Sequence, residues 1–133
     1  MSKPRTIAVD FDGVIHSYTS PWISAEVIPD PPVPGALEWL HEVLQSFDVN
    51  VFTTRAETPE GRVAIKRWFQ QHASERYETT SSTRGLDSLG VTFHKLPAIV
   101  FIDDRAYRFT GSNFPSVQEL HDMKPWWFEQ KRG

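Results

Sequence analysis

The chain has 133 residues, of which 39% are hydrophobic and 23% charged, and this is the composition of an ordinary globular domain. A formal net charge of −3 argues against a broad nucleic-acid-binding surface, and the absence of cysteine excludes disulfides and thiolate metal sites. The first apolar run is too short for a signal peptide, and no run reaches membrane-spanning length. We therefore expect a single cytoplasmic domain over residues 1–133.

Strands and helices alternate along the first half of the chain. Thr6–Val9 is an apolar run that predicts a buried strand ending in acidic residues. Residues 14–34 are rich in proline and predict a flap with a turn or small hairpin. A helix is expected from Pro34-Gly35 onward, followed by a strand over residues 48–53.

The second half begins with a helix whose start is marked by Thr58 as N-cap and Pro59 at the first helical position. The remaining expected segments are an irregular loop over 74–90, a short strand over 91–93, a buried strand over 98–102, a further strand over 107–109, a short helix over 116–122 and an aromatic, then basic, tail over 123–133. This alternation predicts an α/β fold with a mostly parallel sheet.

Polar side chains follow three of the predicted strands. They are Asp10 and Asp12, Thr53 and Thr54, and Asp103 and Asp104. Because ligands of parallel sheets bind at the carboxyl ends of the strands, we expect these side chains to form one site.

The chemistry that such residues support is phosphoryl transfer. Asp10 can attack phosphorus and form an aspartyl-phosphate, while Asp12 can protonate the leaving oxygen and later activate water. Asp103 and Asp104 would complete an all-oxygen site for Mg²⁺. Without a cation, carboxylates this close would repel one another and the substrate.

Further residues would hold the phosphate. Thr53 or Thr54 can donate a hydrogen bond to a phosphoryl oxygen, and Lys95 can supply positive charge. Gly13 allows a tight turn after the acidic pair.

Four segments, taken in order, resemble the haloacid dehalogenase-like (HAD) superfamily in its phosphatase-type form. They are Asp10-Phe11-Asp12-Gly13-Val14-Ile15, Phe52-Thr53-Thr54-Arg55, Lys95 and Ile102-Asp103-Asp104. The resemblance implies a three-layer Rossmann-like fold, a nucleophilic Asp10 and an acid/base Asp12. It also implies Mg²⁺ held by Asp10, the carbonyl of Asp12 and Asp103, with Asp104 close by.

The segments that carry a cap domain in this superfamily are short in this chain. Residues 14–34 are too few for a helical cap, and residues 55–94 are too few for an α/β cap. The resemblance therefore implies a capless member with an open site, which acts on large substrates or borrows a neighbour's surface as a lid.

Several residues have both a functional and a structural interpretation. His16 contacts substrate or packs internally, and Arg55 binds a phosphate or pairs with Glu57. Trp22 stacks on a substrate ring or anchors the flap. Trp126-Trp127 forms a homodimer contact or packs back on the sheet.

Three functions follow from these residues. The leading one is a Mg²⁺-dependent phosphomonoesterase acting on a phosphorylated substrate. The second is a phosphatase for nucleotides or nucleic-acid ends, suggested by the open site and Trp22. The third is a non-catalytic phosphate- or protein-binding module, whose mark would be a missing nucleophile or metal ligand, and none is missing.

Overall fold

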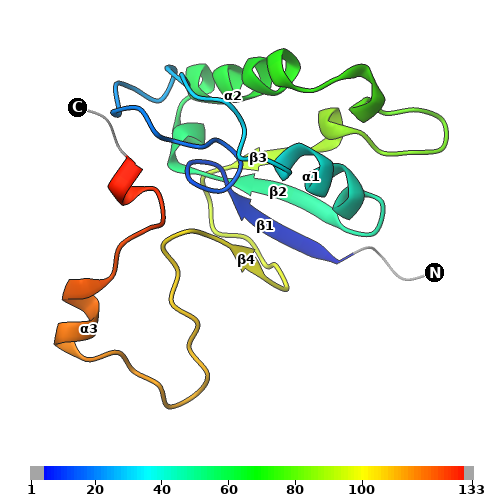
Figure 1. The fold of residues 1–133 in the computed structure, drawn as a ribbon. Helices are drawn as coiled ribbons and strands as arrows, with labels where there is room; N and C mark the ends of the chain where they lie inside the picture. Colours follow the sequence, from blue (N-terminus) through cyan, green and yellow to red (C-terminus); the bar gives the residue numbers. More distant parts are fainter. Residues whose placement is uncertain (1–4, 131–133) are drawn as a thin grey trace.

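The computed structural model describes residues 5–130, and four parallel strands in the order β3-β2-β1-β4 form their central sheet (Figure 1). The strands are β1 Thr6–Asp10, β2 Asp48–Phe52, β3 Gly90–Thr92 and β4 Phe101–Ile102. Asp10 is in register with Phe52, and Phe52 with Thr92. The carboxyl ends of β1, β2 and β3 therefore meet at one edge of the sheet.

Two helices pack against the sheet, α1 Ala36–Leu44 and α2 Pro59–His72. Both begin where the sequence predicts. Gly35 stands at the N-cap of α1 with a φ of 86°, and the Thr58 hydroxyl caps α2 by accepting a hydrogen bond from the Gly61 N–H at 3.0 Å. Pro59 then occupies the first position of α2, where its missing N–H costs nothing.

The core lies between these helices and one face of the sheet. The strands contribute Ile7, Val9, Val49 and Val51, and the helices contribute Leu37, Leu40, Leu44, Ile65, Trp68 and Phe69. Both helices lie on the same side of the sheet in Figure 1. Right-handed crossovers from β1 to β2 and from β2 to β3 step in one direction and so place their helices on one face.

The α/β class and the parallel sheet are thus as predicted, whereas a helical third layer is absent from residues 5–130. The return from β3 to β4 runs through residues 93–100, which contain no helix. The remaining helix, α3 Val117–Asp122, buries none of its residues. Ser116 caps it through a reciprocal capping box with Glu119, at the predicted position.

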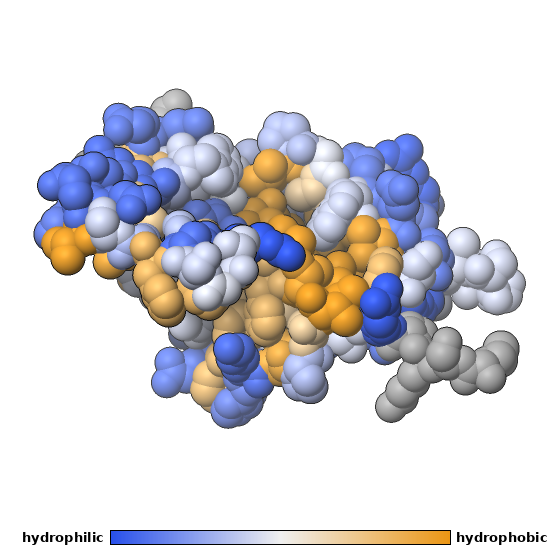
Figure 2. All heavy atoms as spheres, turned by 90° about the horizontal axis from the view of Figure 1, so that it is seen from below, coloured by the Kyte–Doolittle hydropathy of each residue, from blue (hydrophilic) through white to orange (hydrophobic). Residues whose placement is uncertain are grey.

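The prediction of a buried strand over 98–102 is wrong in extent and in burial. β4 covers only Phe101–Ile102 at the edge of the sheet, although the Ile99 N–H also pairs with the Thr6 carbonyl. Ile99 is 50% exposed, and the Phe101 ring contacts that of Phe52 on the face without helices. Figure 2 shows hydrophobic residues gathered on the face seen from below.

The flap over 14–34 contains no helix or extended strand, as the proline content predicts. Backbone hydrogen bonds from Ser17 to Pro31 and from Val33 to Ile15 close its base like a short hairpin. The loop over 74–90 contains two short 3₁₀ turns, Glu75–Tyr77 and Leu86–Ser88.

The C-terminal part differs from expectation at one point, since residues 107–109 form no strand. Residues 131–133 of the predicted tail lie outside the described residues. None of the helices that the structure describes is long and apolar enough to cross a membrane.

Candidate active site

Three carboxylates meet at the carboxyl ends of β1 and β4. Asp10 ends β1, and Asp103 and Asp104 directly follow β4. One oxygen from each lies within 4.8 Å of the others. In the sequence, Asp10 precedes Asp103 and Asp104 by more than ninety positions. The direct pairing of β1 with β4 brings the three carboxylates together.

The electrostatics of this acidic cluster disfavour three negative charges. Burial raises the pKa of Asp10 to about 8, assisted by a hydrogen bond with Asp104 and by the negative charges of Asp103 and Asp104. The Phe11 N–H donates to Asp10 at 2.8 Å and opposes this rise only in part. No ion pair within residues 5–130 neutralises any of the three carboxylates.

One buried oxygen of the cluster could take a cation. Asp104 Oδ1 accepts no N–H or hydroxyl in the described part of the chain. A buried carboxylate oxygen without a donor is costly, and a bound cation would satisfy it. Three carboxylates and no nitrogen or sulfur ligand form a donor set suited to a hard divalent ion such as Mg²⁺.

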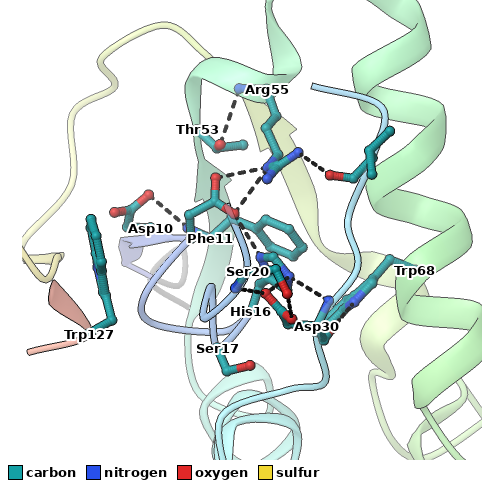
Figure 3. Close-up of polar contacts among 12 residues, drawn as sticks. Asp10, Phe11, His16, Ser17, Ser20, Asp30, Thr53, Arg55, Trp68 and Trp127 are labelled. Carbon is teal, nitrogen blue, oxygen red and sulfur yellow. Dashed lines mark hydrogen bonds and ion pairs between the residues drawn. The ribbon is translucent and has the colours of Figure 1, made fainter. Parts of the chain in front are cut away.

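Asp12 has a different environment from Asp10. The Arg55 Nε–H donates to both of its carboxylate oxygens, at 3.0 and 2.8 Å, and His16 Nδ1 lies 2.8 Å from Oδ1 (Figure 3). Burial acts to raise the pKa of Asp12, but the hydrogen bonds from His16 and Arg55 and the positive charge of Arg55 outweigh it and lower the pKa. The pKa values of the two aspartates are therefore shifted in opposite directions.

The hydrogen bonds of His16 define its tautomer. Its Nε2 accepts the backbone N–H of Asp30 at 3.1 Å, which requires a lone pair on Nε2. The proton of the neutral ring then lies on Nδ1 and is donated to Asp12. His16 is completely buried, and the Trp68 indole N–H of α2 donates to the Asp30 carbonyl, so this network reaches into the core.

Arg55 connects Asp12 to the flap. Its Nη1 donates to the carbonyls of Ser24, Ala25 and Val27, each at 3.0 Å. The ring of Trp22, also in the flap, lies 4.4 Å from the guanidinium carbon. Trp22 is thereby anchored on one side while it remains 49% exposed.

These contacts correct two expectations for substrate-binding residues. The side chain of Arg55 is 1% exposed and that of His16 is 0% exposed, and both donate to Asp12. Burial leaves almost no side-chain surface on either residue for a phosphate, and both contact Asp12 instead. Arg55 pairs with Asp12 rather than with Glu57.

The second predicted signature follows β2 directly. Thr53 is buried, and its hydroxyl accepts the Arg55 N–H at 3.2 Å, which leaves the hydroxyl proton available as a donor. Thr54 is exposed and begins a 3₁₀ helix, Thr54–Glu57. The geometry therefore favours Thr53 over Thr54 as the hydroxyl that could donate a hydrogen bond to a phosphate.

Lys95 forms no ion pair with the acidic cluster in the part of the chain that the structure describes. Its Nζ is 5.8 Å from the centroid of the Phe101 ring. The expected charge contact with phosphate therefore remains a prediction. Arg105 directly follows the cluster: its backbone N–H donates to Asp103, and its guanidinium lies 5.1 Å from the centroid of the Trp127 ring.

Tyr18 is a site residue that sequence reasoning missed. Its φ of 59° lies in the left-handed region, which a bulky residue rarely adopts. Residues with such backbone conformations cluster at functional sites. Its ring packs edge-on against Trp127 with 4.8 Å between centroids. Burial and then the negative charge of Asp12 raise its pKa. A positive φ outside glycine leaves no sequence signal, so only the structure reveals this contact.

Comparisons with family models, with curated proteins and with solved structures find no match for this chain. The functional interpretation therefore depends on the geometry of the site and on the order of its motifs.

Proposed function

We propose that the protein is a Mg²⁺-dependent phosphomonoesterase that acts through an aspartyl-phosphate. The observation that carries the proposal is the division of labour between the two aspartates. Asp10 lies in a carboxylate cluster suited to a cation, and Asp12 is held separately by Arg55 and His16. The order of the strand-end motifs, similar to that of HAD-type phosphatases, supports the same chemistry.

In the proposed first step, an Asp10 oxygen attacks phosphorus, the phosphorus–oxygen ester bond breaks, and Asp12 donates a proton to the leaving alcohol. In the second step, water attacks the phosphoryl-aspartate while Asp12 takes a proton from that water, and phosphate leaves. Arg55 and His16 favour ionised Asp12, which is the form that the second step needs.

Asp10, Asp103 and Asp104 would hold the metal ion in this proposal. A bound Mg²⁺ supplies positive charge that offsets repulsion between the carboxylates and a dianionic phosphate. Thr53 would donate its hydroxyl proton to a phosphoryl oxygen.

A direct test is hydrolysis of p-nitrophenyl phosphate and a panel of nucleotides and sugar phosphates in Mg²⁺. We expect turnover that EDTA abolishes and Mg²⁺ restores. Phosphate binding without turnover, when Mg²⁺ binding has been confirmed by calorimetry, would instead support the non-catalytic alternative.

The nucleotide-directed alternative is favoured by one observation. Trp22 has one face against Arg55 yet is 49% exposed, so a ring is available beside the site for stacking on a base. Under this alternative, Trp22→Leu should raise KM for nucleotides by roughly tenfold and leave KM for sugar phosphates unchanged, since base stacking contributes about 1–3 kcal/mol. Equal KM changes for both substrate classes would argue against it.

Mg²⁺ affinity should depend on pH through Asp10. Because the pKa of Asp10 in the metal-free protein is about 8, the cation must displace a proton below that pH. We expect the apparent Kd for Mg²⁺ to fall by about tenfold per pH unit between pH 6 and 7 and to level off above about 8. Calorimetry in two buffers of different ionisation enthalpy would count the released proton, and a pH-independent Kd would contradict the assignment of Asp10 as a ligand.

A further inference from the structure

The C-terminal tail returns to the candidate active site across most of the sequence. The Trp126 indole N–H donates to the Gly13 carbonyl at 2.6 Å. The Trp127 indole N–H donates to the Oδ2 atom of Asp104. Both indoles therefore make polar contacts with the acidic-site loops, while Trp126 remains 47% exposed. The homodimer contact remains a prediction.

Trp127 is built into the site rather than lying loosely on it. It is only 6% exposed, Tyr18 packs edge-on against its ring, and the Arg105 guanidinium lies 5.1 Å from the ring centroid. Figure 3 shows the Trp127 ring on the side of Asp10, away from the Arg55 and His16 network.

The contact between Trp127 and Asp104 requires glycine at position 13. Gly13 has a φ of 86°, and a Cβ at this position would overlap Asp104 and come within 2.6 Å of Trp127 Nε1. The absence of a side chain therefore lets the tail approach the turn that follows Asp10 and Asp12.

The two oxygens of Asp104 have unequal environments. Oδ2 accepts the Trp127 N–H, while Oδ1 is buried and accepts no N–H or hydroxyl from residues 5–130. The N–H on Oδ2 restrains the rotation of the carboxylate and leaves Oδ1 for a ligand. Residues that do not touch a metal commonly orient its ligands through a hydrogen bond of this kind.

We propose that the tail forms a wall of the active site and that Trp127 is the positioning residue for Asp104. The inference rests on the proposed function, in that the carboxylate cluster takes Mg²⁺. The Trp127 ring, packed between Tyr18 and Arg105, covers one side of a site that has no cap domain. Trp126 holds the wall in place through the Gly13 carbonyl.

The test compares Trp127→Phe with the wild-type chain by titration calorimetry with Mg²⁺ alone. Phenylalanine keeps an aromatic ring and removes the N–H donor. We expect the Kd for Mg²⁺ to rise by about tenfold or more, as for other residues that orient metal ligands. Trp39→Phe is the matched control, because Trp39 lies on α1 and is 37% exposed, and its Kd should match the wild type.

An unchanged Kd in Trp127→Phe would overturn the inference and leave the proposed function intact. A tighter Kd or faster turnover would also overturn it, because the tail would then be a plug rather than a wall. If wild-type protein binds no Mg²⁺, the proposed function and the inference both fail.

A second measurement uses wild-type protein and does not depend on folding of the variant. The indole ¹⁵N–¹H signal of Trp127, assigned in the wild type through its proximity to the Tyr18 ring, should shift when Mg²⁺ is added. The reason is that a cation on Asp104 draws charge from the oxygen that accepts this N–H. A Trp127 signal that stays in place at saturating Mg²⁺ would overturn the inference.

Discussion

Replacing Asp10 by Asn should lower kcat by roughly 10⁴-fold or more, as for other removed nucleophiles, and should stabilise the metal-free protein. The amide cannot form the aspartyl-phosphate, and it is a poorer metal ligand than a carboxylate. Asp10→Asn should therefore lower activity but raise the stability of the metal-free protein. The reason is that a cluster of three carboxylates is unfavourable when no cation is bound.

The sign of the stability effect follows from the raised pKa of Asp10. A carboxyl with a folded-state pKa of about 8 and an ordinary pKa of 3.8 favours folding when protonated. Its contribution is complete below about pH 4 and is lost as pH rises through about 8. Asparagine resembles the protonated form at every pH, so at pH 7 we expect a gain of about 2–4 kcal/mol in the free energy of unfolding.

Urea unfolding in EDTA measures this gain, and Asp12→Asn is the contrasting control. The pKa of Asp12 is lowered, so its ionised form stabilises the fold and its replacement should destabilise it. Mg²⁺ should raise the stability of the wild type by mass action and have little effect on Asp10→Asn. An Asp10→Asn variant that keeps turnover within tenfold of the wild type would remove Asp10 as the nucleophile.

Replacing Arg55 by Met should destabilise the protein by about 3–5 kcal/mol, the usual cost of removing one partner from a buried ion pair. Methionine fills a comparable volume but leaves Asp12 with only His16 as a donor. It also removes the shared donor of three flap carbonyls, those of Ser24, Ala25 and Val27. Activity should fall as well, because Asp12 loses the charged N–H that donates to both of its oxygens.

Arg55→Lys separates the two contributions of the arginine. Lysine keeps the charge but cannot reach Asp12 and the flap carbonyls together, since it has a single ammonium group instead of a planar fork. We expect intermediate stability and a lower kcat. Urea unfolding and kcat measurements on both variants test this, and a loss below 0.5 kcal/mol for Arg55→Met would contradict the central role of the network.

Local sequence signals predicted the parts of the fold that depend on local chemistry. Thr58 and Pro59 mark the start of α2, and Ser116 marks that of α3, because caps satisfy backbone groups within one turn. The 98–102 strand shows the limit of such signals. An apolar run predicts burial, but burial requires a covering element, and the 93–100 connection provides none.

The sequence also predicted that Asp10 lies close to Asp103 and Asp104. The reason is that the carboxyl ends of parallel strands meet at one edge of the sheet. Only the tertiary structure decided the partners of these residues. Arg55 and His16 reach Asp12 from separate segments, and Trp127 reaches Asp104 from the far end of the chain. Such contacts depend on side-chain direction and loop path, which no local pattern encodes, and they distinguish the roles of two aspartates that stand two positions apart.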